Sequence, residues 1–192
     1  TVNATEISQV AGSGITTFDG AVTTDGANGV NVTNGDIDLN NTITTLGDGT
    51  VDLDATAGDL DIDAAGDITA DGAVTLSAGA GAINTAGDVT TTDDNITFTD
   101  ATVLTGTVAV DTDADAGTIT FADTLDGTQN LTLAAGLGDI DFDGVVGTTR
   151  LGDVLVNSVA TMTADFAFDA ASFTQTAGSV ATIFTGALDV TN

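Results

Sequence analysis

Residues 49–76 contain the stretch that decides the fold, GTVDLDATAGDLDIDAAGDITADGAVTL. Three segments of it share one pattern. A glycine is followed by one polar or small residue and then by two apolar residues with a single residue between them. They are Gly49-Thr-Val-Asp-Leu53, Gly58-Asp-Leu-Asp-Ile62 and Gly72-Ala-Val-Thr-Leu76. Alternation with a period of two places apolar side chains on one side of a strand and polar side chains on the other. Because glycine suits the backbone of a tight corner, each segment is predicted to be a short strand that follows a turn.

The same pattern recurs along the rest of the chain. Further copies start at Gly35, Gly106, Gly117, Gly138 and Gly186. Helix is disfavoured, because Gly, Thr, Asp and Val are poor helix formers and no apolar stripe with a 3.6-residue period persists. Ile, Leu, Val and Phe make up about 26% of the residues, above the ~20% below which charged chains are usually disordered. We therefore expect a folded, all-β chain.

The spacing of the apolar residues selects an architecture within the all-β class. Along the sequence, the steps of one series are 23, 22, 23 and 21, and those of a second series are 23, 23, 25, 23 and 23. The first series is Val51, Val74, Ile96, Ile119 and Ile140, and the second is Ile37, Leu60, Ile83, Val108, Leu131 and Val154. Two interleaved series with one period are typical of a solenoid in which each coil adds a strand to each face. The sequence thus predicts a right-handed parallel β-helix (β-solenoid) with about 23 residues per coil and strands stacked ~4.8 Å apart.

A third, shorter series suggests a third face. Its members are Ile43, Ile68 and Val89, with steps of 25 and then 21, after which the pattern fades near Asp113. This face is therefore expected to be less regular. The phenylalanines expected to stack in one column of the core are Phe98, Phe121 and Phe142. The alternative architecture is an antiparallel sandwich, in which turn signals recur about every eight to twelve residues and loop lengths vary freely.

A longer repeat lies on top of the short one. The segment at residues 7–22 recurs at a constant offset of 166, with eight of 16 positions identical, where composition alone would give roughly two. The identical pairs are Gln9/Gln175, Ala11/Ala177, Gly12/Gly178, Ser13/Ser179, Thr16/Thr182, Phe18/Phe184, Gly20/Gly186 and Ala21/Ala187. We expect residues 1–192 to be a single β-solenoid segment, with a block of about 166 residues starting near residue 7 and the next copy beginning near residue 173. An offset of about seven coils would return the repeated element to the same face.

The charge of the chain excludes several classes of partner. It has 28 aspartates, one glutamate and a single basic residue, Arg150, for a formal net charge of −28. Nucleic acid is excluded, because no cationic surface exists to displace the counterions of its phosphates. No apolar run approaches the ~18 residues of a membrane-spanning helix, so we expect no membrane insertion. The lack of cysteine and histidine removes disulfides, thiolate chemistry and histidine metal ligands.

Paired carboxylates require that an enzyme be considered, because some parallel β-helices cleave polysaccharides. Glycosidases need two carboxyl groups at a defined separation, one of them with a raised pKa. Sugar-binding grooves also commonly use aromatic platforms, and this chain has neither Trp nor Tyr. A lyase would place a basic residue beside calcium, but we interpret Arg150, the one candidate, as a solvated turn residue. We expect no enzyme and no catalytic or cofactor-binding residues.

Calcium is the metal that the acidic residues favour. Aspartates on neighbouring coils would lie ~4.8 Å apart and repel one another unless they are screened or bridged. A hard cation with oxygen ligands would relieve this repulsion. The candidate calcium ligands are Asp52, Asp54, Asp141 and Asp143 on one face, and Asp38, Asp61 and Asp63 on another. The alternative interpretation is a solvated acidic surface that keeps a long fibre soluble.

These residues also carry a family resemblance. The Gly-x-Ile/Val-x-Leu/Phe pattern, the bias toward Ala, Gly, Thr and Asp, and the absence of cysteine resemble the β-helical repeats of filamentous-haemagglutinin-like adhesins and of giant repeat-rich bacterial surface proteins. The resemblance implies a structural repeat segment of an extracellular filament, fibre or adhesin stalk on a prokaryotic cell surface. Neighbouring copies stacked end to end are the expected partners. The alternative function is a calcium-dependent binding module for surface glycans or other cells.

Overall fold

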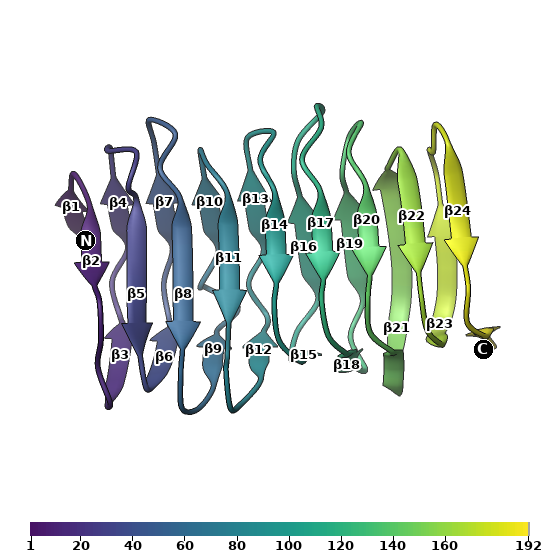
Figure 1. Cartoon of the computed structure of the whole chain (residues 1–192), viewed down its shortest axis with the longest axis horizontal. Coiled ribbons are helices and arrows are strands. Elements are labelled where there is room, and N and C mark those ends of the chain that lie inside the picture. Colours follow the sequence, from purple (N-terminus) through teal and green to yellow (C-terminus); the bar gives the residue numbers. More distant parts are fainter. Residues whose placement is uncertain (192) are drawn as a thin grey trace.

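The computed structural model describes residues 1–191, which form 25 strands and no helix. Figure 1 shows the strands stacked along one axis, from β1 and β2 at the N-terminal end to β24 at the C-terminal end. The front strands run downward and the chain returns upward behind them while it advances from left to right, which is a right-handed coil. Within the described residues, no helix is long and apolar enough to span a membrane. The prediction of an all-β, right-handed parallel solenoid is confirmed.

Each coil contributes one strand to each of three faces. Face 1 contains β1 (Val2–Ala4), β4 (Val22–Thr24), β7 (Ile43–Thr45), β10 (Ile68–Ala70), β13 (Val89–Thr91), β16 (Val108–Asp111) and β19 (Leu131–Ala134). Face 2 contains β2 (Ile7–Gln9), β5 (Val30–Asn34), β8 (Val51–Ala55), β11 (Val74–Ser77), β14 (Ile96–Phe98), β17 (Ile119–Phe121), β20 (Ile140–Phe142), β22 (Thr161–Ala164) and β24 (Ala181–Phe184). Face 3 contains β3 (Ile15–Phe18), β6 (Asp36–Leu39), β9 (Leu60–Ile62), β12 (Ile83–Thr85), β15 (Thr102–Leu104), β18 (Leu125–Gly127) and β25 (Leu188–Val190).

Two long strands turn the corner between faces 3 and 1. β21 (Val146–Ser158) pairs with β18 through Val146 and with β19 through Val154, so it lies on both faces. β23 (Phe168–Gln175) pairs with β21 along its length and with β25 at its start. Faces 1 and 3 therefore form one 16-stranded sheet, while face 2 is a separate nine-stranded sheet.

The strand register confirms the first apolar series. Val51, Val74, Ile96, Ile119 and Ile140 are successive partners on face 2. The step between stacked partners varies along the chain, because the turns differ in length: it is short from Ile83 to Thr102 and long from Ile43 to Ile68. The chain makes about nine turns of roughly 21 residues. The mean coil is thus slightly shorter than the spacing of the apolar series predicts.

The second and third series need correction after Ile83. Ile83 pairs with Thr102 on face 3, whereas Val108 lies on face 1. The inward position that follows Ile83 is a threonine, which interrupts the apolar pattern and hides the true partner. The third series lies on face 1 and does not fade near Asp113, because Val89 pairs with Val110, and the column continues to Leu133 and then Val156.

The expectation that the long repeat returns to the same face is wrong. Ile7 starts β2 on face 2, whereas its counterpart Phe173 pairs with Val154 on face 1. β3 on face 3 corresponds to β24 on face 2, and β4 on face 1 corresponds to β25 on face 3. The repeat offset therefore spans eight turns less one face, which is about 7⅔ turns. The repeated element comes back rotated by one face of the triangular coil.

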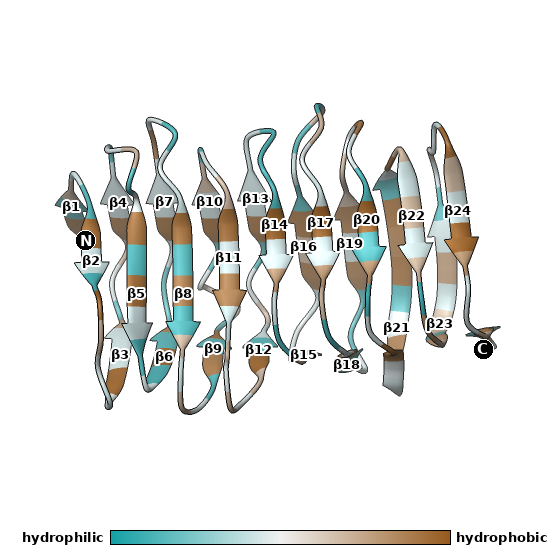
Figure 2. Ribbon diagram, viewed as in Figure 1, coloured by the Kyte–Doolittle hydropathy of each residue, from teal (hydrophilic) through white to brown (hydrophobic). Residues whose placement is uncertain are grey.

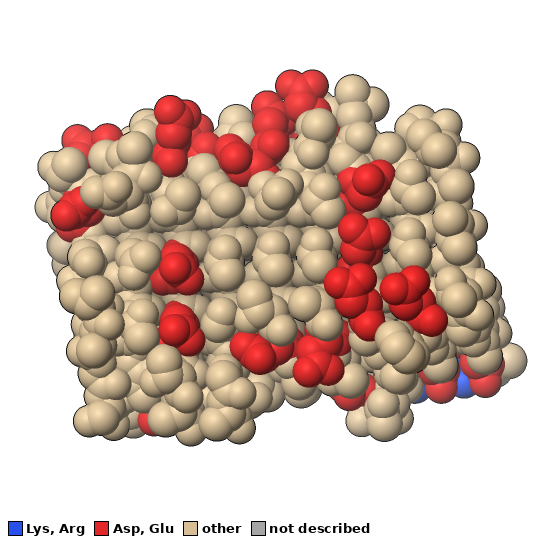
Figure 3. Space-filling model, viewed as in Figure 1, with Lys and Arg blue, Asp and Glu red and all other residues tan. Residues whose placement is uncertain are grey.

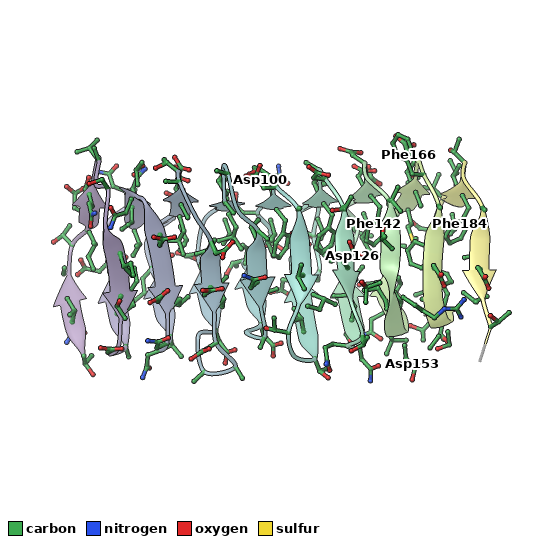
Figure 4. The ribbon with its side chains drawn as sticks, turned by 90° about the horizontal axis from the view of Figure 1, so that it is seen from below. Asp100, Asp126, Phe142, Asp153, Phe166 and Phe184 are labelled. Atoms are coloured by element: carbon green, nitrogen blue, oxygen red, sulfur yellow. The ribbon has the colours of Figure 1, made fainter. Side chains whose placement is uncertain are left out.

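The alternating pattern fills the interior with apolar side chains, and Figure 2 shows brown bands that alternate with teal or pale bands along many strands. Phe98, Phe121 and Phe142 stack as predicted, with ring centroids 4.6 and 5.3 Å apart and nearly parallel planes. Phe168 continues the column with an edge-on contact of 5.5 Å to Phe142. In Figure 4, Phe142 lies between the strand layers, while Phe166 points outward. The core is thus one continuous column along the solenoid axis.

Candidate functional site: the acidic surface and the two coil edges

Many aspartates form ladders along the corners of the solenoid. Asp67 accepts a hydrogen bond of 2.9 Å from the backbone N–H of Asp88, and Asp88 accepts one of 2.7 Å from the N–H of Ala109. Asp36 and Asp59 form a second ladder of the same kind that ends at Ala82. Equivalent bonds join Asp93 to Asp115, Asp126 to Thr149 and Asp139 to Thr161. In each case the carboxylate provides an acceptor for an N–H group of the next coil.

This capping role was missed in the sequence, although a compositional signal for it exists. The chain has 28 aspartates and one glutamate. The carboxylate of an aspartate is one methylene closer to the backbone than that of a glutamate. It can therefore reach the N–H of a coil stacked ~4.8 Å away while its own backbone keeps the coil register. Asn95 and Asn130, which have the same length, make the same bond to Thr118 and Asp153.

We expect Asp88→Ala to lower the free energy of unfolding by about 1–2 kcal/mol, because the N–H of Ala109 loses its charged acceptor. Asp88→Asn is the matched control, since it removes the charge but keeps a side-chain oxygen at the same place. Urea unfolding at neutral pH measures both variants. The capping interpretation fails if the alanine variant is as stable as the asparagine variant.

Face 3 brings three of the candidate calcium ligands together. Asp38 on β6 and Asp61 on β9 are stacked partners, and Asp63 comes directly after β9. With Asn40 and Asn84 they line a shallow depression. Asn84 donates a hydrogen bond of 2.8 Å to Asp61. Burial, and then the charge of Asp61, raise the pKa of Asp38 above its ordinary value.

Face 2 separates the other four candidates into two pairs. Asp52 lies between Asn31 and Thr75 in the stack, so its neighbours are neutral. Asp141 lies between Thr120 and Thr163. Four coils, about 19 Å at the usual strand spacing, separate the pair Asp52/Asp54 from the pair Asp141/Asp143, and Figure 3 shows the uncharged strip between them. The outward positions are those expected, but they do not form a continuous acidic ladder.

Calcium binding at these carboxylates stays a prediction. Among residues 1–191, no three acidic side chains are grouped closely enough to hold a metal ion. The asparagine and threonine neighbours already separate or hydrogen-bond many of the carboxylates. Among the candidate ligands, Asp38 and Asp61 are the two carboxylates that stack directly on each other in neighbouring coils.

The pKa of Asp52 gives stability a measurable dependence on pH. Burial, and then the charge of Asp54, raise this pKa above its ordinary value of 3.8. Between the ordinary pKa and the raised one, the folded chain holds more protons than the unfolded chain, so this contribution to stability is lost as the pH rises. We expect Asp52→Asn to raise stability at neutral pH and to flatten the acid part of the curve. Urea unfolding from about pH 3 to pH 7 measures both effects.

An exposed control, Asp25→Asn, corrects that experiment for the change in net charge. Asp25 is exposed in a turn after β4. If the two variants show the same dependence of stability on pH, the environment of Asp52 has no special effect.

Arg150 is a coil-to-coil clamp and not the solvated turn residue that the sequence suggested. It lies within β21 and is partly buried. Its Nε is 2.7 Å from a carboxylate oxygen of Asp169, and its Nη2 is 3.3 Å from one of Asp189. Its Nη1 donates to the backbone oxygen of Thr191. The single basic side chain of the protein thus ties the last three coils together on face 3.

Both ends of the described solenoid present their core in cross-section. Val2 stacks on Val22 at the N-terminal end and is 49% exposed. At the C-terminal end Leu188 stacks on Phe168, faces the core and is 44% exposed. Residues at the equivalent inward positions of the middle coils are almost fully buried. At both edges, apolar residues at inward positions are therefore exposed.

Comparisons of the chain with protein-family models, with curated proteins and with solved structures find no match. The resemblance to filamentous-haemagglutinin-like adhesins therefore stays an expectation from the sequence pattern. The described chain is thus an acidic rod whose two end coils expose apolar residues.

Proposed function

We propose that this chain is a structural repeat segment of an extracellular filament or adhesin stalk on a prokaryotic cell surface, built by stacking solenoid coils end to end. One observation carries the proposal: the repeated element at residues 7–22 and 173–188 forms most of the first and of the last coil, and both coils present core-facing apolar residues at an open edge. Open strand edges favour further parallel pairing. The extracellular placement is supported by the resemblance of the repeat pattern to surface adhesins.

The geometry of the repeat sets the symmetry of such a fibre. One repeat block spans about 7⅔ turns, so its rise is ~37 Å at ~4.8 Å per coil. Each block is rotated by one face relative to the block before it. Any feature of the surface then follows a three-fold screw around the fibre and returns to the same face after three blocks.

The acidic side faces support the same role. A formal net charge of −28 makes parallel rods repel one another at low and moderate salt. Attraction between apolar edges remains, because it does not depend on charge. Growth along the axis is then favoured over lateral clumping.

End-to-end association is the test of the proposal. Sedimentation velocity over a range of protein concentrations should show oligomers that become longer with concentration. We expect Leu188→Lys to reduce this association about tenfold or more, because it places a charge in the apolar edge. Thr185→Lys, at an exposed turn position of the same coil, is the matched control. A sharp monomer at high concentration for the unaltered chain would contradict the proposal.

A further inference from the structure

A small polar cluster lies inside the N-terminal end of the core, where coils one and two meet. The hydroxyl of Thr16 donates a hydrogen bond of 3.0 Å to Oε1 of Gln9 within the first coil. Nδ2 of Asn34, at the end of β5 in the second coil, donates one of 2.7 Å to the same hydroxyl. Asn34 is 4% exposed. We call these three residues the Gln9 cluster.

Two of these three residues, the glutamine and the threonine, have counterparts in the last coil. The hydroxyl of Thr182 donates a hydrogen bond of 2.5 Å to Oε1 of Gln175, at the repeat offset from Thr16 and Gln9. We call these two residues the Gln175 pair. Among residues 1–191, no side chain occupies the place that Asn34 has in the Gln9 cluster. Thr182 is accordingly exposed, while Thr16 is partly buried.

The recurring glycine next to the glutamine supports a common construction. A Cβ at Gly12 would lie 2.8 Å from Nε2 of Gln9 and 2.0 Å from Oδ1 of Asn34. A Cβ at Gly178 would lie 2.1 Å from Nε2 of Gln175. Glutamine, glycine and threonine thus recur together because they form one structural unit.

The apolar surroundings of the Gln175 pair correspond as well. In the first coil, Val30 stacks on Ile7 and Leu39 stacks on Phe18. Phe173 and Phe184 take the places of Ile7 and Phe18 in the last coil, pack against the core and remain partly exposed. The second coil, which covers the first, therefore shows which kind of coil fits this edge.

We propose that the C-terminal edge binds the next coil of the same repeat array, a coil with the pattern of Val30–Leu39, whose asparagine amide completes the Gln175 pair. The inference rests on the proposed end-to-end stacking and names the segment that stacks. A buried polar contact also fixes the register, because a shift by one residue would leave the asparagine amide without its acceptor, the threonine hydroxyl, inside the core. The apolar residues supply attraction, and the asparagine supplies the alignment.

The test grafts this coil onto the full chain. In the grafted chain, residues 25–46 are repeated after Val190 in place of residues 191–192, because Val190 corresponds to Thr24 in the repeat. We expect backbone amides of residues 181–190 to exchange with deuterium at least tenfold more slowly than in the parent chain. In the grafted copy only, Asn34→Ala should remove most of that protection, whereas Asn31→Ala, at an exposed outward position, should not.

A double-mutant cycle makes the test independent of a general loss of folding. Thr182→Val removes the hydroxyl that the grafted asparagine is expected to bind. If the contact forms, the effects of Asn34→Ala and Thr182→Val on exchange are not additive, and they differ from additivity by threefold or more. Additive effects, or equal protection in the grafted chain with and without Asn34→Ala, would overturn the proposal.

The other occupant of this edge is the N-terminal edge of a second copy. End-to-end association of the parent chain at high concentration is expected to protect residues 181–190 less than the grafted coil does. If the two protect these residues equally, the coil with the asparagine adds nothing and the proposed coil is wrong. Loss of end-to-end association in sedimentation, with coupling retained in the grafted chain, would count against the fibre alone.

Discussion

Phe121→Ala is expected to lower the free energy of unfolding by about 3–5 kcal/mol. Phe121 is 1% exposed and lies between Phe98 and Phe142 in the stacked column. The substitution removes apolar surface from the core and leaves a cavity, and the rigid coils above and below limit the collapse of that cavity. Urea unfolding followed by far-ultraviolet circular dichroism measures the change.

The matched control for this prediction is Phe166→Ala. Phe166 is 53% exposed and points away from the core, so its removal should change stability by less than about 0.5 kcal/mol. Similar losses for the two variants would mean that the phenylalanine column contributes no special packing.

Gly29→Ala is the second change for which we expect a large effect, about 2–4 kcal/mol of destabilisation. Gly29 precedes β5 with a φ of +57°, a conformation that costs an alanine energy. Its added Cβ would also lie 1.9 Å from the backbone oxygen of Thr50 in the next coil. Because that oxygen belongs to the coil stack, relief requires the two coils to separate.

Gly14→Ala controls for the loss of a glycine as such. An added Cβ at Gly14 meets nothing within 4 Å, and its φ lies outside the left-handed region. We expect no loss of stability there, since alanine restricts the unfolded chain more than glycine does. Thermal unfolding of both variants distinguishes backbone strain and overlap from a general effect of glycine replacement. Equal melting temperatures would contradict this explanation.

Local pattern was enough to predict the strands and one face of the solenoid. Val51, Val74 and Ile96 were placed in one column because each lies in an alternating segment and the step between these segments is nearly constant. The stacking of Phe98, Phe121 and Phe142 followed from the same step. The candidate ligands Asp38 and Asp61 were correctly expected to be neighbours for this reason.

Only the tertiary structure decided on which face the strand after each irregular turn lies. Ile83 pairs with Thr102, a polar residue at an inward position, so no apolar signal marked the true partner. The rotation of the repeat by one face depends on the sum of all turn lengths between residues 7 and 173, and small deviations in each turn accumulate.

The roles of the charged residues were also decided by contacts distant in sequence. Asp88 caps the N–H of Ala109, and Arg150 binds Asp169 and Asp189. An isolated aspartate or arginine has the same appearance in a sequence whether it is solvated or bonded. The sequence by itself therefore determined the period, the inside and the outside of this protein. For the irregular turns and most of the charged side chains, the partners across the coils were decided by the tertiary structure, because these residues follow no pattern with the period of the coil.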